Sequence, residues 1–358
     1  MIAAKNLYIC HLKIKENSMS KQLFFNKFQE FISKYKHAVI VSHVNPDGDA
    51  IGSSLAFYFF LLKLGIDAKV IIPNDFPSFL SWMPGIDNIL IFDKNSEKGV
   101  EYLNAADVIC YLDFNHPSRT GLIHNDLCHC TKTPRILIDH HRDTDYSQFE
   151  AYLSEVETSS TSELVAELIQ YHGFDKYLDD NIATCLLVGI MTDTGSFAHS
   201  IYHPETFEIC GKMISPTVNY QLIHSKIYNT FSENRLRLLG YCISNRLTIL
   251  KEYHTAYIYL NKADLEAFNY QVGDTEGVVN YPLMIDDIKM AVLITERQDV
   301  IRFSFRSKGE FSVHELARAH FNGGGHTNAA GGTLNCTIEQ AINAFIKVLP
   351  QYKTLLNK

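Results

Sequence analysis

Between about residues 20 and 215, short runs rich in β-branched residues alternate with segments of helical periodicity, and this alternation constrains the fold more than any other feature. The apolar runs read AVIVSH, AKVIIP, ILIF, VICYLDF and RILIDHH. Such alternation is typical of a parallel β-sheet whose two faces are covered by helices. We therefore predict an α/β domain of this kind. Helices are expected at about residues 53–65, 161–172, 181–191 and 204–215.

The remainder of the chain has a different pattern. Residues 220–247 contain no proline and only one glycine, Gly240, and their apolar residues recur at helical spacing, which predicts a long connecting helix. From about residue 252, hairpin-like strands (TAYIYL, KMAVLITE and VIRFSFRS) precede a helix, a glycine-rich loop and a final helix, which predicts a smaller α+β domain. The expected boundaries are an extension at 1–19, a first domain at 20–218, the connecting helix at 219–250 and a second domain at 251–358, with a cleft between the domains.

The composition is that of an ordinary soluble protein, with 46% hydrophobic residues among 358. The longest apolar run, Leu55–Leu62, is too short to span a bilayer. The first eighteen residues lack the basic start, apolar stretch and cleavage site of a signal peptide. We therefore expect a cytoplasmic protein with no membrane partner. We also expect the extension at 1–19 to be disordered, with Met19 as a candidate for the true start.

The net charge of −8 bears on the partners of the protein. Binding of long nucleic acid depends on many contacts from Lys and Arg to phosphates, so the acidic balance argues against it. A small anionic substrate is still compatible with this charge. Bound metal ions and a few arginines can make one cleft positive on an otherwise acidic surface.

The eight cysteines form no CxxC pair, so the sequence predicts no disulfide framework, which is consistent with a reducing compartment. One local cluster, in HNDLCHC, brings His124, Cys128, His129 and Cys130 close together along the chain. These side chains could approach a zinc ion, but their spacing matches no usual structural zinc module. We favour a loop between two strands at this position.

Side chains that can bind metal gather where the predicted strands end. They are His43, Asp47, Asp49, Asp113, Asp139, His140, His141 and Asp193. His43, Asp113 and the triplet 139–141 end the runs AVIVSH, VICYLD and RILIDHH, and Asp193 follows a helical segment that could close the same crevice. The carboxyl ends of neighbouring parallel strands converge on one crevice, which is where such sheets bind ligands. The sequence therefore predicts one shared site.

For a single aspartate the simpler interpretation is a helix cap or an Asp/Gly-rich turn, because Asp favours both positions for local reasons. That interpretation does not account for the whole set. Carboxylates and imidazoles crowded together, with no Lys or Arg between them, would repel one another unless cations were present. Mixed carboxylate and imidazole ligands suit Mn²⁺, with Fe, Co or Zn as competitors, and suit Mg²⁺ or Ca²⁺ less. We predict a divalent metal centre, with Mn²⁺ preferred.

The motifs resemble those of a known family. HVNPDGDAIGS at 43–53, Asp113, the triplet at 139–141 and Asp193 resemble the four ordered motifs of the DHH phosphoesterase superfamily. FRSKG at 305–309 and NGGGHTNAAGG at 322–332 resemble the signature of a DHHA1-type domain, which distinguishes the chain from family-II pyrophosphatases. The resemblance covers nearly the whole chain, and its best match is the stand-alone nanoRNase and pAp-phosphatase branch.

This resemblance implies a catalytic DHH domain at 20–218 and a substrate-binding DHHA1 domain at 251–358. The implied activity is metal-dependent hydrolysis of short RNA, of about two to five nucleotides, and of 3′-phosphoadenosine 5′-phosphate (pAp), with a hydroxide held between two ions as the nucleophile. The implied ligands are His43, Asp47 and Asp113 for one ion, and Asp49, Asp113, His140 and Asp193 for the other. His141 would face the scissile phosphate, and Asp139 would hold the site residues in position without contacting the metal ions.

The second domain is expected to bind the substrate. Glycines 323–325 would let the backbone approach a phosphate, and His326 could donate to it, although a GGG run alone is most often a flexible turn. Arg306 and Ser307, with Arg302 on the same strand, could hold a terminal phosphate. For Arg302 the competing interpretation is a solvated strand residue. The residues that line this expected site are Arg302, Arg306, Ser307, Gly323, Gly324, Gly325 and His326.

Two departures from the family pattern and several alternatives remain. Asn322 stands where many relatives have a glycine, and Thr327 stands where many have a basic residue, which could change the binding of a second phosphate.

The alternative activity is hydrolysis of cyclic di-AMP or pApA, and an exonuclease on long strands is disfavoured by the acidic charge. A different class of protein would be a catalytically inactive nucleotide-binding regulator. Related proteins are often dimers, so a homodimer is also considered, without an interface signature in the sequence.

Overall fold

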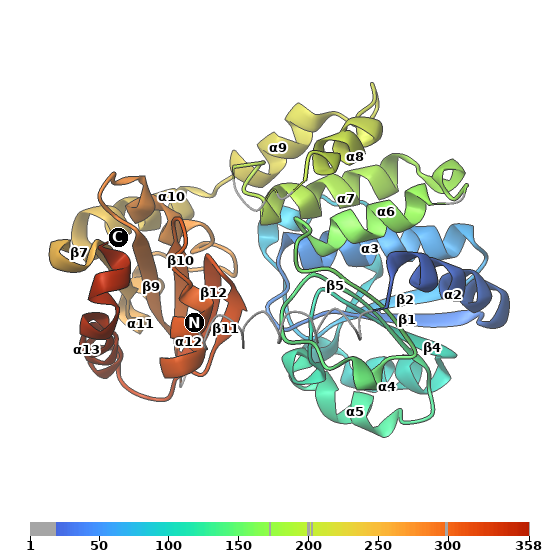
Figure 1. Ribbon diagram of the computed structural model, residues 1–358, viewed down its shortest axis with the longest axis horizontal. Coiled ribbons are helices and arrows are strands. Elements are labelled where there is room, and N and C mark those ends of the chain that lie inside the picture. The colour runs from blue at the N-terminus through green and yellow to red at the C-terminus, as the bar shows by residue number, and fades with distance from the viewer. Residues whose placement is uncertain (1–18, 172, 199–200, 202, 298–299, 358) are drawn as a thin grey trace, which may run out of the picture. The chain divides into compact units, whose positions relative to one another are not determined.

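The computed structural model describes residues 19–171, 173–198, 201, 203–297 and 300–357, so the extension expected at 1–19 lies outside the described residues except for Met19. The chain divides into two compact units, Met1–Thr230 and Phe231–Lys358 (Figure 1). The unit boundary falls within the segment that was expected to connect the two domains. Each unit has its own sheet.

Unit 1 is built on a six-stranded sheet in the order β3-β2-β1-β4-β5-β6, and every neighbouring pair is parallel. Its strands are β1 (His37–Val41), β2 (Asp67–Ile72), β3 (Ile89–Ile91), β4 (Val108–Leu112), β5 (Arg135–Asp139) and β6 (Ala151–Ser154). The predicted parallel sheet is confirmed, although edge strand β6 was not predicted. The strand order reverses between β1 and β4, and open parallel sheets bind ligands at such a switch point.

Helices cover both faces of this sheet, as predicted (Figure 1). They are α2 (Lys21–Lys34), α3 (Gly48–Lys63), α4 (Ser96–Ala105), α5 (Ile123–His129), α6 (Thr161–Gln170), α7 (Asp180–Asp193), α8 (Glu205–Met213) and α9 (Tyr220–Tyr228). Side chains of α2, α3, α6 and α7 form one large buried core, and side chains of α4 and α5 form another on the opposite face. Because α3 is packed between other elements, its first ten residues are buried all round, which explains its apolar run.

Unit 2 contains a second six-stranded sheet in the order β11-β12-β10-β9-β8-β7. Its elements are α10 (Glu233–Tyr241), β7 (Leu247–Leu250), β8 (Thr255–Leu260), α11 (Lys262–Ala267), β9 (Met290–Arg297), β10 (Val300–Ser307), α12 (Val313–His320), β11 (Gly324–His326), β12 (Ala329–Leu334) and α13 (Ile338–Leu356). The predicted α+β class is confirmed. The prediction of hairpins is wrong for β8 and β9, which are parallel, because α11 and the 3₁₀ helix at Val278–Met284 intervene between them.

The single connecting helix predicted at 219–250 is also wrong. Helix α9 ends at Tyr228, α10 begins only at Glu233, and a π-helical turn at Cys242–Arg246 leads into strand β7. The interruption is local in origin, because the Ser232 hydroxyl accepts from the Arg235 N–H and caps a new helix. Helical spacing of apolar residues could not reveal this break, since both short helices keep the same period.

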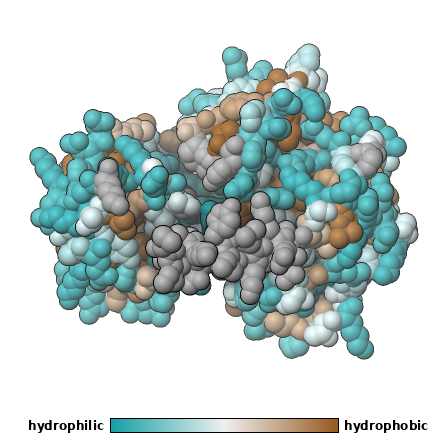
Figure 2. All heavy atoms as spheres, in the orientation of Figure 1, coloured by the Kyte–Doolittle hydropathy of each residue, from teal (hydrophilic) through white to brown (hydrophobic). Residues whose placement is uncertain are grey.

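The surface shown in Figure 2 is mostly hydrophilic, and hydrophobic residues gather on unit 1 over α8 and α9. Exposed Phe207, Ile214 and Leu222 belong to this part of the chain. Across the described ranges, we find no helix with the length and hydropathy needed to cross a membrane.

Glycine 52 allows α3 to pack closely on α7. A Cβ atom at this position would lie 2.5 Å from the carbonyl oxygen of Cys185 and 2.9 Å from the backbone nitrogen of Gly189. Both neighbours are backbone atoms in the middle of α7, so they cannot move aside as a flexible side chain could. The two helices therefore depend on glycine for their distance, and α3 carries two of the predicted metal ligands at its start.

We expect Gly52→Ala to destabilise the protein by about 1–3 kcal/mol, because it overpacks this contact. The matched control is Gly211→Ala in α8, where a Cβ would meet nothing within 4 Å and a modest gain in helix stability is expected. The measurement is the midpoint of urea unfolding for both variants and the wild type. Equal midpoints for Gly52→Ala and the wild type would contradict the proposed constraint.

Candidate metal centre

The backbone brings the candidate ligands to the switch point of the parallel sheet. His43 follows β1, and Asp113 directly follows β4, where its N–H donates to the Ile138 carbonyl at 3.1 Å. Asp113 has a φ of 67°, in the left-handed region that non-glycine residues rarely adopt. Such strain costs about 1–3 kcal/mol and is usually found at functional sites. The strained backbone at Asp113 therefore marks this strand end as a functional position.

Asp113 stands at the centre of the cluster because its two oxygens contact different imidazoles. Oδ2 lies 3.4 Å from His43 Nε2, and Oδ1 lies 3.5 Å from His140 Nε2. His140 Nε2 also lies 3.4 Å from Asp193 Oδ2 and 3.9 Å from Asp49 Oδ2. The residues His43, Asp49, Asp113 and His140 are each no more than 5% exposed. One carboxylate is thus shared between two sets of ligands.

Asp47 has two roles in the structure. Its Oδ1 accepts from the N–H groups of Asp49 and Ala50, at 3.0 and 3.1 Å, so it is the N-cap of α3. It also belongs to a group of candidate ligands with His43 and Asp113. The helix-cap interpretation is therefore confirmed, and it is compatible with the predicted role of Asp47 as a metal ligand.

Residues at the start of α6 orient two of the candidate ligands, Asp49 and Asp113, through hydrogen bonds. The backbone N–H groups of Thr161 and Ser162 donate to the two oxygens of Asp49, at 2.7 and 2.9 Å. The Thr161 hydroxyl donates to Asp113 Oδ1 at 2.9 Å. Thr161 is fully buried, and the sequence interpretation missed it, because Ser and Thr residues where a helix begins are also an ordinary N-terminal signal.

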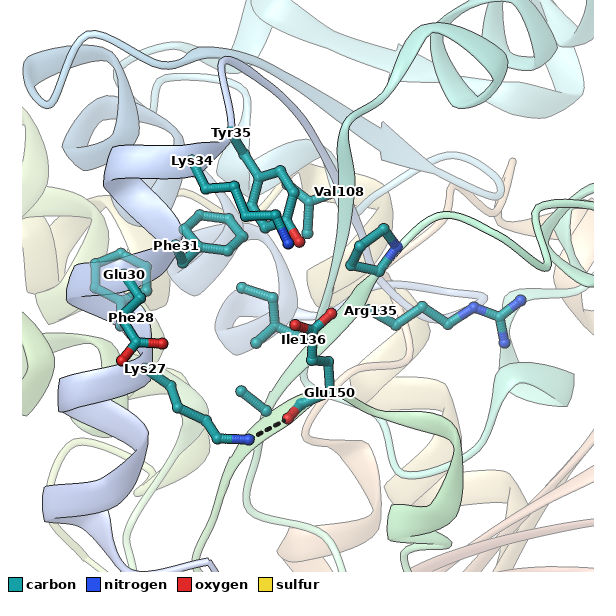
Figure 3. A pocket seen from close by; sticks show the side chains of 12 residues that line it. Lys27, Phe28, Glu30, Phe31, Lys34, Tyr35, Val108, Arg135, Ile136 and Glu150 are labelled. Carbon is teal, nitrogen blue, oxygen red and sulfur yellow. Dashed lines mark hydrogen bonds between the residues drawn. The ribbon is translucent and has the colours of Figure 1, made fainter.

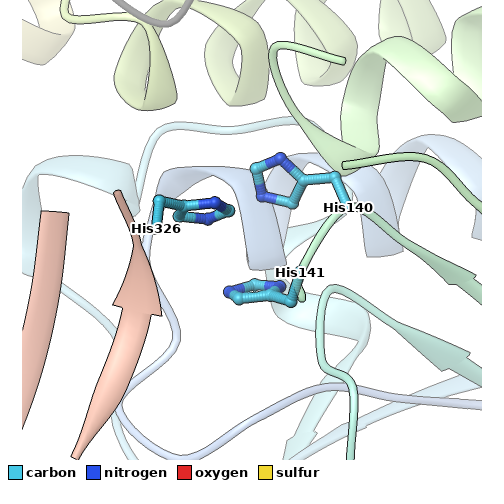
Figure 4. Close-up of side chains that lie close together, drawn as sticks. All are labelled: His140, His141 and His326. Atoms are coloured by element: carbon cyan, nitrogen blue, oxygen red, sulfur yellow. The ribbon is translucent and has the colours of Figure 1, made fainter. Parts of the chain in front are cut away.

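His141 and Asp139 form a pair beside the cluster. His141 Nδ1 lies 2.7 Å from Asp139 Oδ1 and 3.8 Å from Asp113 Oδ1. The rings of His140 and His141 lie edge to face, with centroids 4.9 Å apart (Figure 4). Asp139 is completely buried, and its other oxygen has no hydrogen-bond partner among the described residues. Asp139 thus orients His141, as histidine-supporting carboxylates commonly do.

Burial and mutual repulsion shift the pKa values of the cluster toward neutral forms. Burial raises the pKa of Asp49 to about 7, and burial followed by the charges of Asp49, Asp47 and Asp193 raises the pKa of Asp113 well above its usual range. Burial lowers the pKa of His140. Without cations, the fold therefore holds these groups at an energetic cost.

This donor set fits divalent metal ions. The groups His43–Asp47–Asp113 and Asp49–Asp113–His140 each offer ligand atoms within 4.8 Å of one another. A cation would relieve the repulsion that raises the carboxyl pKa values. Buried carboxylate oxygens with imidazole nitrogens are typical ligands of first-row divalent metals. The structure thus brings together all six predicted ligands. Among the side chains that form the ion pairs of the cluster, that of Asp193 is the most exposed.

The cluster in HNDLCHC lies in helix α5 instead of the expected loop. His124 Nε2 and Cys128 Sγ are 3.7 Å apart, one helical turn from each other. Among the described residues, the groups of three or more potential ligands do not include this pair. The structure therefore offers no support for a zinc site here.

A cavity of about 160 Å³ lies at the opposite edge of the sheet, near the amino ends of β4 and β5 (Figure 3). Phe28, Phe31 and Tyr35 form one wall, and the Lys27 ammonium donates to the Glu150 carbonyl at 2.9 Å. None of the predicted ligands lines it. Its position, at the edge where parallel sheets do not usually bind substrates, separates it from the metal centre.

In unit 2, the predicted substrate-binding residues occupy strand β10 and the loop around β11. Arg302 and Arg306 alternate with the buried residues of β10, so they share the strand face opposite Ser307. The Ser307 hydroxyl donates to the Phe311 carbonyl at 2.6 Å and accepts from Asn328 Nδ2 at 2.9 Å. It therefore has a structural role of its own.

Close packing of the backbone explains two of the glycines in the run at 323–325. A Cβ on Gly323 would lie 1.9 Å from the Gly331 carbonyl oxygen. Gly325 has a φ of 147°, and a Cβ there would lie 2.5 Å from the Ala329 carbonyl oxygen. Both glycines let β11 approach β12 closely. Gly324 and His326 lie in the same short strand.

Comparisons with known proteins agree with this architecture. Residues 37–190 match the DHH family, N-terminal domain, and residues 252–354 match the DHHA1 domain. An exopolyphosphatase-related protein from Bacteroides fragilis is 40% identical, with a TM-score of 0.88 over 95% of this chain and 100% of that chain. The bifunctional oligoribonuclease and PAP phosphatase of Thermus thermophilus is 26% identical over 88% of this chain and 90% of its own. A cyclic-di-AMP phosphodiesterase of Listeria monocytogenes is 24% identical over 94% of this chain and 51% of its own.

The raised carboxyl pKa values predict how the stability of the metal-free protein changes with pH. Burial lowers the pKa values of His43, His140 and His141, which by itself makes stability rise with pH, but this rise is nearly complete about one pH unit above the unfolded histidine pKa of about 6.5. Asp49 and Asp113 have folded pKa values above their unfolded ones, so their contribution to stability is lost as pH rises through the folded values. We expect the melting temperature in EDTA to fall between about pH 7.5 and 8.5, where the raised pKa of Asp113 acts without opposition from the histidines.

Metal binding should reverse this trend, because it requires ionised carboxylates. In Mn²⁺ the melting temperature should exceed that in EDTA, and the difference should grow from about pH 7.5 to 8.5. Thermal unfolding followed by circular dichroism measures both. A melting temperature in EDTA that rises over this range would contradict the assignment of the pKa shifts.

The hydrogen bond from Thr161 to Asp113 predicts a role in metal affinity. Thr161→Val keeps the shape of the side chain but removes the donor, so Asp113 loses one constraint on its orientation. We expect about tenfold weaker Mn²⁺ binding, as is typical for groups that orient metal ligands. Thr161→Ser keeps the hydroxyl and should bind nearly as wild type, which isothermal titration calorimetry can test. Equal affinities of Thr161→Val and the wild type would show that the bond is only structural.

Proposed function

Because the chain belongs to the DHH family and carries the family's DHHA1 domain, we propose that it is a two-metal phosphoesterase that hydrolyses very short RNA and pAp. The observation that carries the proposal is the shared carboxylate of Asp113, whose oxygens contact His43 and His140 separately. A carboxylate shared between two sets of ligands suits a pair of neighbouring ions.

The proposed ligands divide into two sets. His43, Asp47 and Asp113 would hold one ion, and Asp49, Asp113, His140 and Asp193 the other, with Mn²⁺ preferred for this mixture of oxygen and nitrogen. Bound there, the two ions would activate water for attack on phosphorus and offset the negative charge that develops. Thr161 and the N–H groups at the start of α6 hold the carboxylates in fixed orientations.

His141 is proposed as the proton carrier. An ionised Asp139 accepts the proton of Nδ1, at 2.7 Å, so the neutral ring would keep Nε2 as an acceptor. Burial, followed by the charge of Arg119, lowers the pKa of His141 well below its usual value, which supports a neutral ring at rest. His141 can then receive a proton at Nε2 and pass it to the leaving oxygen.

The substrate class is proposed from several supports. The relative from Thermus thermophilus, which matches 88% of this chain, is named for oligoribonuclease and PAP phosphatase activity. The net charge of −8 disfavours long nucleic acid. Arg302, Arg306 and His326 of unit 2 are proposed to bind the substrate's other phosphate. A homodimer and a cytoplasmic location are compatible with this proposal.

Hydrolysis of cyclic di-AMP or pApA is the second candidate, favoured by the cyclic-di-AMP phosphodiesterase of Listeria monocytogenes. That relative is about twice as long as the segment that aligns with this chain, since only 51% of it is covered. A catalytically inactive regulator is the third candidate. The complete set of ligands around Asp113 supports an active enzyme over this alternative.

A substrate panel with Mn²⁺ tests the proposal. We expect pAp and RNA of two to five nucleotides to be hydrolysed at least about tenfold faster, by kcat/KM, than a 24-nucleotide RNA, cyclic di-AMP or inorganic polyphosphate. The control is Asp113→Asn, which should abolish turnover of every substrate because it disturbs both ligand sets. Faster hydrolysis of cyclic di-AMP than of pAp would favour the second candidate, and no hydrolysis even of bis-p-nitrophenyl phosphate would favour the third.

A further inference from the structure

Arg119 lies in a short 3₁₀ helix, Pro117–Thr120, that follows Asp113 and β4. This loop is tied directly to the loop that carries the first ligand. The Arg119 carbonyl accepts from the Val44 N–H at 2.7 Å, and the Val44 carbonyl lies 2.9 Å from His43 Nδ1. The backbone of Arg119 is therefore two hydrogen bonds away from the His43 ring.

The loop is held in this place by close packing. Gly121 has a φ of 57°, and a Cβ at this position would lie 2.6 Å from Val44 Cγ1. The Thr120 hydroxyl is buried and donates to the Pro117 carbonyl at 2.6 Å. A loop fixed on both sides of Arg119 presents its side chain from a constant position at low entropic cost.

The Arg119 loop lies against the segment of His43, and the charge of Arg119 influences the pKa values of the same cluster. After burial, it is the next largest effect that lowers the pKa of His43 and of His141, and it also acts on Asp139 and His140. Yet among the residues that the structure describes, the Arg119 guanidinium has no hydrogen-bond or ion-pair partner. Its charge therefore influences these groups through space, and no carboxylate of the described residues forms an ion pair with it.

Arg119 is half-buried, and a guanidinium without an ion-pair partner among the described residues is suited to bind an anion. If Arg119 served only to neutralise the carboxylates, an ion pair with one of them would be expected, because that geometry gives the larger Coulombic gain. A tetrahedral phosphate offers two oxygens to the planar fork of donors. Binding of an anion by Arg119 needs no residue of unit 2, because all six predicted metal ligands belong to unit 1.

Resting on the proposed function, we propose that Arg119 is a catalytic residue that donates hydrogen bonds to the non-bridging oxygens of the scissile phosphate. Its guanidinium would stabilise the charge that grows on these oxygens during attack, in addition to the effect of the metal ions. The sequence interpretation did not single out Arg119, because one arginine in a loop has no periodicity and no motif to mark it.

The test compares Arg119→Gln and Arg119→Lys with the wild type, each loaded with Mn²⁺. The control is Arg237→Gln, an exposed arginine in α10 that pairs with Glu233. Three quantities are measured: kcat/KM for bis-p-nitrophenyl phosphate, the Kd of inorganic phosphate by calorimetry, and the Mn²⁺ content by elemental analysis. Phosphate binding is used because it reports on the anion site without turnover.

We expect Arg119→Gln to lower kcat/KM about 100-fold and to weaken phosphate binding about tenfold, with unchanged Mn²⁺ content. Arg119→Lys should be intermediate, because a point charge replaces the fork. Arg237→Gln should match the wild type. A phosphate Kd within twofold of the wild type, loss of Mn²⁺ from Arg119→Gln, or no phosphate binding by the wild type would overturn the assignment. If the wild type binds phosphate through Arg119 but does not hydrolyse pAp or short RNA, the proposed substrate fails and the role of Arg119 stands.

Discussion

The repulsion among buried carboxylates around Asp113 is the constraint on which the rest of the structure depends. Asp49 and Asp113 are almost fully buried, and burial raises both of their pKa values. Such a cluster is unfavourable unless cations are present and the surrounding chain holds the ligands in place. The sheet, the strained backbone at Asp113 and the close helices can be understood as the support for this site.

The support comes from elements far apart in the sequence. The sheet places His43 and Asp113 at its switch point, and α6 provides N–H donors to Asp49 from more than a hundred residues away. Helix α3 carries Asp49 in its first turn and is fixed against α7 through Gly52. The candidate metal centre is therefore as rigid as the packing of α3 against α6 and α7, which favours well-defined positions of the candidate ligands.

The sequence was a good guide where one local signal determined the outcome. Strands β1, β4 and β5 are continuous apolar runs because both faces of a parallel sheet are covered. The polar residues that directly follow each run could therefore be predicted to lie at the carboxyl end of a strand. It was a poor guide where two outcomes share a pattern. The break before Glu233 keeps helical periodicity, and the parallel pairing of β8 with β9 looks like a hairpin from the strand sequences alone.

The sequence by itself therefore determined the class of the fold and the chemical type of the site, because alternating periodicity and ligand residues at strand ends are local properties of the chain. Only the tertiary structure decided which side chains support those ligands. Thr161 carries no signal that is specific to this role, because its role depends on a hydrogen bond to Asp113 in another segment, and the proposed role of Arg119 likewise depends on a loop that is held against Val44. Contacts between segments distant in sequence are set by packing and sheet order, which no short pattern encodes.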